Sequence, residues 1–66
     1  MNLTTYETRI MDDIVAGLSQ REIAAKQGKA HQTIASHIEH VRDKLGATTT
    51  AQAAVIYSRV NNELEN

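Results

Sequence analysis

The chain has 66 residues with three glycines, no cysteine, no proline and a formal net charge of −1. Such a length makes one small domain, predicted to span residues 1–66, which buries only about 60% of its unfolded surface. The lack of cysteine excludes a disulfide framework, a thiolate zinc site and a cysteine nucleophile. No apolar run approaches the ~20 residues that cross a membrane, so we expect a cytoplasmic protein without a membrane partner.

Charge is distributed unevenly along the chain. Residues 17–46 carry five lysines and arginines against three carboxylates, together with all three histidines. Residues 1–16 carry one arginine against three carboxylates, and residues 47–66 carry one against two. A basic centre between acidic ends indicates an anionic partner, although an excess of this size also occurs on ordinary solvated faces.

The first predicted helix covers about residues 5–16. Thr4 and Glu7 have the S/T-x-x-E spacing of a capping box, in which the two side chains satisfy free backbone N–H groups at a helix start. Asp12 and Asp13 are expected on its solvated surface. Apolar side chains recur through it at helical spacing, namely Tyr6, Ile10 and Ile14.

The second and third predicted helices cover about residues 20–27 and 31–45. Ser19 and Glu22 form a second capping box, whereas Ala30, which precedes the third helix, has no capping side chain. The third helix carries a narrow apolar stripe, within about 60° of arc, formed by Ile34, Ile38, Val41 and Leu45. This stripe predicts which face of the third helix is buried.

The fourth predicted helix covers about residues 50–64 and begins at a third capping box, Thr49 with Gln52. No segment alternates long enough to form a strand. The short link around Gly28 favours a steep crossing of the second and third helices, as in a helix-turn-helix. The predicted fold class is therefore an all-α domain of four helices.

Motifs in chain order resemble the DNA-binding domain of LuxR/GerE-type transcription regulators. The matching segments are Leu3-Thr4-x-x-Glu7, Gly17-Leu18-Ser19-x-x-Glu22-Ile23-Ala24, Thr33-Ile34-x-x-His37-Ile38 and Lys44-Leu45-Gly46. The resemblance implies a third helix that enters the DNA major groove and a fourth helix that forms a two-fold dimer contact. Because the chain has no room for a receiver or ligand-sensing domain, we expect the stand-alone kind.

Several residues depart from the usual family pattern. Tyr6 stands where an arginine is usual, and Ala30 stands where a serine commonly caps the third helix. Ala35 replaces a frequent lysine, and Thr50 replaces a frequent arginine. The scaffold is thus kept while several expected DNA contacts differ.

The third helix supplies the candidate DNA contacts. The resemblance implies base contacts at Ala35, Ser36 and Glu39, and the face opposite the apolar stripe agrees with this and adds Gln32. Gln32 suits adenine and Glu39 suits the cytosine amino group. The predicted phosphate contacts are polar or basic residues in or near the helix-turn-helix, namely Arg21, Lys29, His31, Thr33, His40 and Lys44.

The fourth helix supplies the predicted dimer interface, by resemblance at Ala54, Val55, Tyr57 and Ser58, although its apolar side could instead complete the core. His37 is expected to have a structural role. His37 and His40 lack a third metal ligand, so no metal site is expected. No cofactor is expected either. A catalytic site is not predicted, because there is no glycine-rich phosphate loop and no recognisable nucleophile set.

The sequence supports two functions from different classes. The first is a sequence-specific DNA-binding transcription regulator of bacterial or phage origin, which acts at the nucleoid as a homodimer on an inverted repeat. The second is a protein-binding module that pairs with a LuxR-type regulator or RNA polymerase and modulates transcription without reading DNA. The ordered motifs and basic centre favour the first; the low net charge, Ala35, Glu39 and Thr50 favour the second.

Overall fold

Four helices make up the fold in the computed structural model, which describes residues 2–65 and the side chains of residues 2–60. Helix α1 spans Thr5–Val15, α2 spans Gln20–Gln27, α3 spans His31–Leu45 and α4 spans Thr50–Glu65. Residues 2–65 contain no strand. The all-α, four-helix fold class predicted from the sequence is therefore confirmed.

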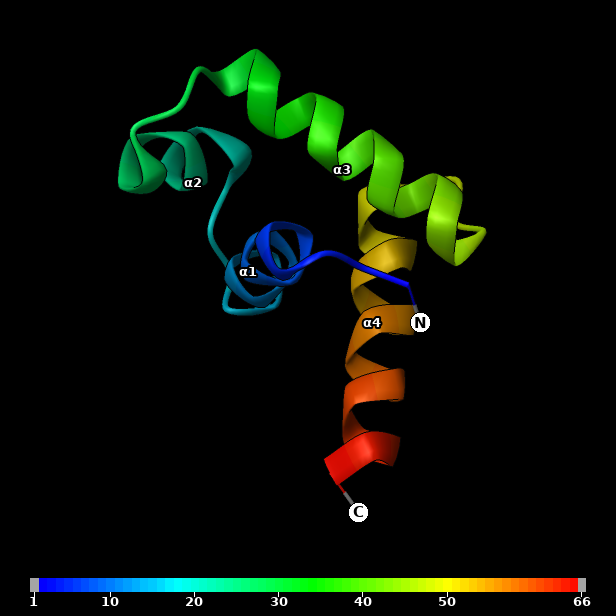
Figure 1. Ribbon diagram of the computed structural model, residues 1–66. Helices are drawn as coiled ribbons and strands as arrows, with labels where there is room; N and C mark the ends of the chain where they lie inside the picture. The colour runs from blue at the N-terminus through cyan, green and yellow to red at the C-terminus, as the bar shows by residue number, and fades with distance from the viewer. Residues whose placement is uncertain (1, 66) are drawn as a thin grey trace.

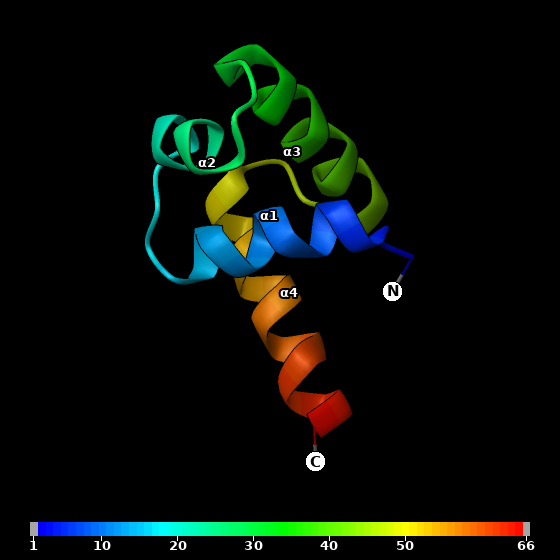
Figure 2. The ribbon, with the colours of Figure 1, turned by 60° about the vertical axis from the view of Figure 1, so that its left-hand side comes forward.

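Helices α1 and α3 form the centre of the arrangement, since each of them contacts the other three helices. Helix α3 crosses over α1, with α2 beside the first half of α3 and α4 meeting its second half (Figure 1). A second view shows α4 packing across α1 and continuing beyond it toward the C-terminus (Figure 2). None of the helices described is long and apolar enough to cross a membrane.

The helix starts follow the predicted capping chemistry in two of three cases. The Thr4 hydroxyl accepts from the Glu7 backbone N–H at 3.1 Å, and the Glu7 carboxylate accepts from the Thr4 N–H at 2.9 Å. Ser19 and Glu22 repeat both bonds at the start of α2. At α4 the box is only half formed: Thr49 caps the Gln52 N–H, but the Gln52 amide oxygen accepts from the backbone of the preceding residue, Thr48.

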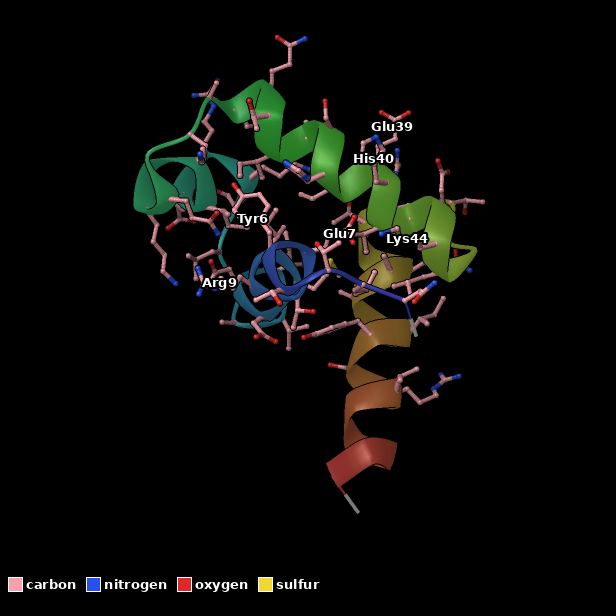
Figure 3. All side chains as sticks on the ribbon, in the orientation of Figure 1. Tyr6, Glu7, Arg9, Glu39, His40 and Lys44 are labelled. Carbon is pink, nitrogen blue, oxygen red and sulfur yellow. The ribbon has the colours of Figure 1, made fainter. Side chains whose placement is uncertain are left out.

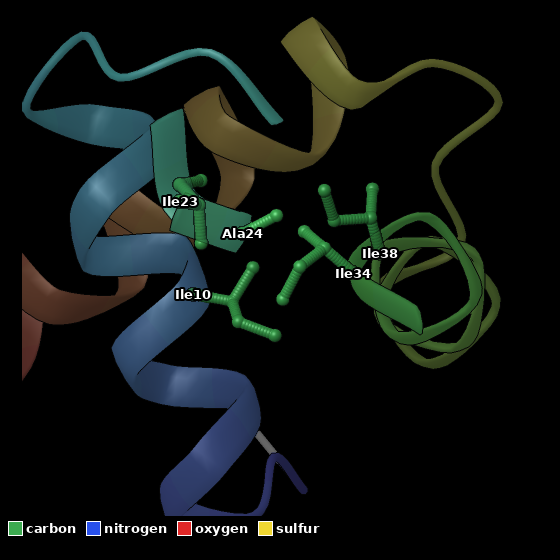
Figure 4. Packing of buried hydrophobic residues seen from close by; sticks show 5 residues of the cluster. All are labelled: Ile10, Ile23, Ala24, Ile34 and Ile38. Carbon is green, nitrogen blue, oxygen red and sulfur yellow. The ribbon is translucent and has the colours of Figure 1, made fainter. Parts of the chain in front are cut away.

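The core consists of two groups of buried side chains. The first joins α1, α2 and α3 and contains Ile10, Ile23, Ala24, Ile34 and Ile38, which converge between the three helices (Figure 4). The second joins α1, α3 and α4 and contains Met11, Val41, Ala47, Ala53 and Tyr57. Ile14 of α1 packs against both groups. The predicted apolar stripe of α3 thus faces inward, with Ile34, Ile38 and Val41 buried and Leu45 half-buried.

The start of α3 offers a direct test of capping. Ala30 has the extended N-cap backbone (φ −67°, ψ 145°) but makes no side-chain cap bond. We expect Ala30→Ser to raise the free energy of unfolding by about 1 kcal/mol, because a serine hydroxyl can accept from a free backbone N–H there. Urea denaturation measures the change. The exposed Ala25→Ser within α2 makes the same chemical change away from a cap, and equal stabilisation by both variants would contradict the explanation.

Candidate nucleic-acid interface

Helices α2 and α3 are held at a sharp turn by a glycine. Gly28 ends α2 in the left-handed conformation (φ +64°), and its N–H donates back to the last turn of α2. The next N–H, of Lys29, donates to Ala24 O at 2.9 Å. A left-handed residue at this position disfavours any side chain with a Cβ, so glycine permits the turn. The turn sets the direction in which α3 leaves α2.

One face of α3 is free of the core. Gln32, Ser36 and Glu39, three of the predicted base contacts, are exposed along this face at spacings of four and three residues. Figure 3 shows Glu39 extending from α3 on the side away from α1. Ala35, the fourth predicted base contact, is half-buried. The exposed row is therefore polar and carries a carboxylate, and Ala35 lies at its edge.

Most of the predicted phosphate contacts lie exposed around this row. The exposed side chains are those of Arg21, Lys29, His31, Thr33 and His40.

His37 is half-buried, and its ring meets the ring of Tyr6 edge-to-face at a centroid distance of 4.7 Å. Within the part of the chain that the structure describes, no three potential metal ligands come together.

Lys44, the remaining predicted phosphate contact, has a partner within the fold. Its ammonium donates to the Glu7 carboxylate at 2.7 Å, across 37 residues of sequence. Figure 3 shows the two side chains meeting between α1 and α3. Glu7 is only 4% exposed and also caps α1. Lys44 therefore ties α3 to the start of α1 through its ion pair with Glu7.

The environment of Glu7 favours its charged form. Burial opposes ionisation, but the hydrogen bond from Lys44, the bond from the Thr4 backbone N–H and the positive charge of Lys44 outweigh it. Together they hold the pKa of Glu7 below its ordinary value. The carboxylate therefore stabilises the fold at neutral pH.

This pKa gives a pH-dependent prediction. Glu7→Gln keeps an acceptor for the cap but removes the charge, so we expect the free energy of unfolding at pH 7 to fall by roughly 1 kcal/mol. The pKa of Glu7 is lower in the folded state than the ordinary carboxyl pKa of 4.5. The loss of stability caused by Glu7→Gln is therefore complete above pH 4.5 and becomes smaller as the pH falls through the folded-state pKa of Glu7. Denaturation curves between pH 7 and pH 3 measure it. A loss that stays constant over this range would contradict the ion-pair explanation; exposed Glu39→Gln is the matched control and should change stability little.

One of the two aspartates near the end of α1 differs from the sequence prediction. Asp13 is buried and accepts from Lys26 of α2 at 2.7 Å, and the Asp12 carboxylate accepts from the Tyr57 hydroxyl of α4. The expectation of a solvated position is therefore wrong for Asp13 and confirmed for Asp12, which stays exposed while it accepts a hydrogen bond from α4. The partners are 13 and 45 residues away in sequence, so spacing along the chain gives no signal for them.

The predicted dimer surface needs one correction. Tyr57 is 2% exposed and belongs to the core, because it faces α1 together with Ala53. Ala54 and Ser58 are half-buried, and Val55 is 56% exposed. These three residues and the end of α1 line a shallow groove, which we call the α1–α4 surface; its residues are Ile14, Val15, Ala54, Val55, Ser58 and Arg59.

A short helix, a glycine turn and a longer helix with a polar exposed face define a helix-turn-helix domain. Residues 1–57 match the family of bacterial regulatory proteins called luxR, and the chain belongs to this family. It is 37% identical over 51 residues to the probable HTH-type transcriptional regulator GfsR of Streptomyces halstedii, covering 77% of this chain and 21% of that protein. It is 28% identical over 60 residues to the probable transcriptional regulatory protein SgaR of Hyphomicrobium methylovorum, covering 91% of this chain and 28% of that protein.

The chain thus spans between a fifth and a third of the length of these curated relatives. No solved structure shows a significant match.

Proposed function

We propose that the chain is a sequence-specific DNA-binding transcription regulator that places α3 in the major groove. The observation that carries this proposal is the exposed polar row Gln32, Ser36 and Glu39, on the helix that follows the turn of a luxR-family helix-turn-helix. An α-helix fits the major groove, where each base pair presents a distinct set of donors and acceptors. The proposal assigns the protein to the cytoplasm, at the nucleoid, and involves no catalytic step.

Each residue of the row has its own chemistry for base edges. The Gln32 amide can donate to N7 and accept from the amino group of adenine, whereas the Glu39 carboxylate accepts from the amino group of cytosine. Ser36 serves either kind of base, and Ala35 can touch only a thymine methyl from the edge of the row. Arg21, Lys29, His31, Thr33 and His40 would contact phosphates on either side and fix the position of α3.

We propose further that two copies pair through the α1–α4 surface and bind an inverted repeat. Val15 and Val55 are 48% and 56% exposed, which makes them the large apolar side chains exposed within residues 2–60. Burying them against a second copy removes apolar surface from water. A two-fold pair would bring two α3 helices to half-sites one DNA turn, or a multiple of it, apart.

The second function, a protein-binding module, is favoured by a specific feature of α3. Glu39 and Asp43 are exposed on it, and Lys44 is engaged by Glu7. Carboxylates facing a polyanion weaken sequence-independent affinity. In this alternative the α1–α4 surface would pair with a related regulator or with RNA polymerase, and α3 would not contact bases.

Selection from a random duplex library separates the two functions. Enrichment of an inverted repeat, with affinity that falls steeply with salt, is the outcome expected for the DNA-binding dimer. Enrichment of a single half-site would support sequence-specific DNA binding and contradict the proposed dimer. Failure to enrich any sequence, with only weak salt-sensitive binding, would contradict DNA reading and favour the protein-binding module.

Glu39 provides a residue-level prediction within this experiment. Glu39→Ala removes the carboxylate that we assign to a cytosine amino group, so discrimination at one base pair of each half-site should fall by about 1–3 kcal/mol. Competition binding with single-substituted operators measures it. Because Glu39 is exposed, the fold should be unaffected. Asp43→Ala, one turn further along α3, is the control and should leave that base preference intact; an equal loss in both variants would contradict the assignment.

A further inference from the structure

A second groove, between α1 and α2, carries an excess of positive charge. Its volume is about 580 Å³, and it is lined by Tyr6, Arg9, Asp12, Asp13, Lys26, Gln27 and Lys29. In Figure 3, Tyr6 and Arg9 both extend from α1 on the side that faces α2. Lys29 lies in the turn immediately before α3, so one end of the groove adjoins the candidate nucleic-acid interface.

The carboxylates of this groove already have partners within the fold. Asp13 holds Lys26 at 2.7 Å, and Asp12 accepts from the hydroxyl of Tyr57. Arg9 and Lys29 are exposed, and neither takes part in an ion pair within residues 2–60. Arg9 and Lys29 are therefore available to an anion from outside. Because a neutral hydroxyl does not offset the charge of Asp12, three cations against two carboxylates leave the groove a net charge of +1.

Two neutral groups in the same groove also lack partners. The Tyr6 hydroxyl and the Gln27 amide oxygen are both buried from solvent and make no hydrogen bond. Leaving a buried polar group unpaired costs about 1–3 kcal/mol, so such a group favours a ligand that can pair with it. A tyrosine hydroxyl can donate to an acceptor, and rotating the Gln27 amide by half a turn exchanges its oxygen for an N–H donor.

We propose that this groove binds a phosphate group. Arg9 and Lys29 supply the charge and the exposed donors. The Tyr6 hydroxyl and the Gln27 amide are covered in the unbound fold and supply further hydrogen-bond donors once their side chains rotate toward the ligand. Donors from α1, α2 and the turn suit a tetrahedral anion with several acceptor oxygens, and a guanidinium can engage two of them at once. The phosphate could belong to the DNA backbone beside α3 or to a free phosphate; only the first source rests on the proposed function.

Inorganic phosphate titrated at constant ionic strength, followed by 1H–15N correlation spectra, tests the free source. Saturable shifts are expected at amides of α1 and α2 that border the groove. Arg9→Gln and Lys29→Gln should each weaken binding roughly tenfold through loss of a charged partner. Tyr6→Phe should also weaken binding without lowering the melting temperature, because the lost hydroxyl has no partner in the fold. Arg42→Gln removes a positive charge outside the groove, at a residue with no assigned phosphate contact, and should leave the titration unchanged.

Salt titration of duplex binding tests the DNA source. If a backbone phosphate occupies the groove, Arg9→Gln should reduce the slope of log affinity against log salt by about 0.9. If Arg9→Gln leaves this slope unchanged but weakens the binding of inorganic phosphate, the groove binds free phosphate and not the DNA backbone. If Arg9→Gln and Lys29→Gln alter neither measurement, the site is refuted. Saturable phosphate binding by a wild-type chain that binds no duplex would keep the site and overturn the proposed function.

Discussion

Replacing Val55 with aspartate is expected to lower affinity for an inverted repeat by about a hundredfold. Val55 is the most exposed large apolar side chain of the α1–α4 surface. A carboxylate there loses the apolar contact and must give up its hydration in a two-fold pair, which opposes pairing even with Arg59 one turn away on α4. Two linked half-sites gain on the order of 10²–10⁴ in avidity over one, and this gain is lost when the copies separate.

The same variant carries its own control in the isolated half-site. Affinity for one half-site should match that of the wild type, because Val55 lies on α4 and the proposed base contacts lie on α3. Sedimentation velocity should show a smaller species at concentrations where the wild type pairs. If Val55→Asp binds the inverted repeat as tightly as the wild type, the α1–α4 surface is not the dimer contact.

Replacing Ile34 with alanine should unfold a large fraction of the protein. Ile34 is fully buried between α1, α2 and α3, and deleting such a side chain costs about 2–5 kcal/mol, including the cavity that remains. Domains of this size have a total stability of about 3–10 kcal/mol. Thermal unfolding followed by circular dichroism measures the loss, and affinity for any DNA operator should fall with it.

An exposed site gives the comparison for this substitution. Val55→Ala also removes part of a branched apolar side chain, but from a position that is half open to solvent. The free energy of unfolding of Val55→Ala should change by less than about 0.5 kcal/mol in the monomer. Equal destabilisation by the two variants would mean that the buried group around Ile34 does not hold the helices together.

Features that depend on neighbours in sequence could be predicted. The capping boxes at Thr4 and Ser19 rest on residues three apart, and both form as expected. The buried face of α3 follows from the helical repeat, which also places Gln32, Ser36 and Glu39 on the exposed side. The turn at Gly28 follows from the conformational freedom of glycine.

Features that depend on how helices cross could not be predicted. In the sequence, nothing distinguishes Lys44 from a free cation or Asp13 from a solvated carboxylate. The fold pairs Lys44 with Glu7 of α1 and Asp13 with Lys26 of α2. Tyr57 is buried in the core while Ala54, three residues earlier, is half-buried against it, so the burial of Tyr57 depends on the angle at which α4 crosses α1. The groove between α1 and α2 has the same origin, because its lining comes from both helices and the turn.

Ile14 packs against both groups of buried side chains, so the two halves of the core are in contact with the same side chain. One half holds the helices that would read DNA, and the other anchors the helix that would pair two copies. Loosening either half exposes a face of the same side chain to water and weakens the other half as well. The domain should therefore melt in a single cooperative transition, with no stage at which α4 has detached while the α2–α3 unit stays folded.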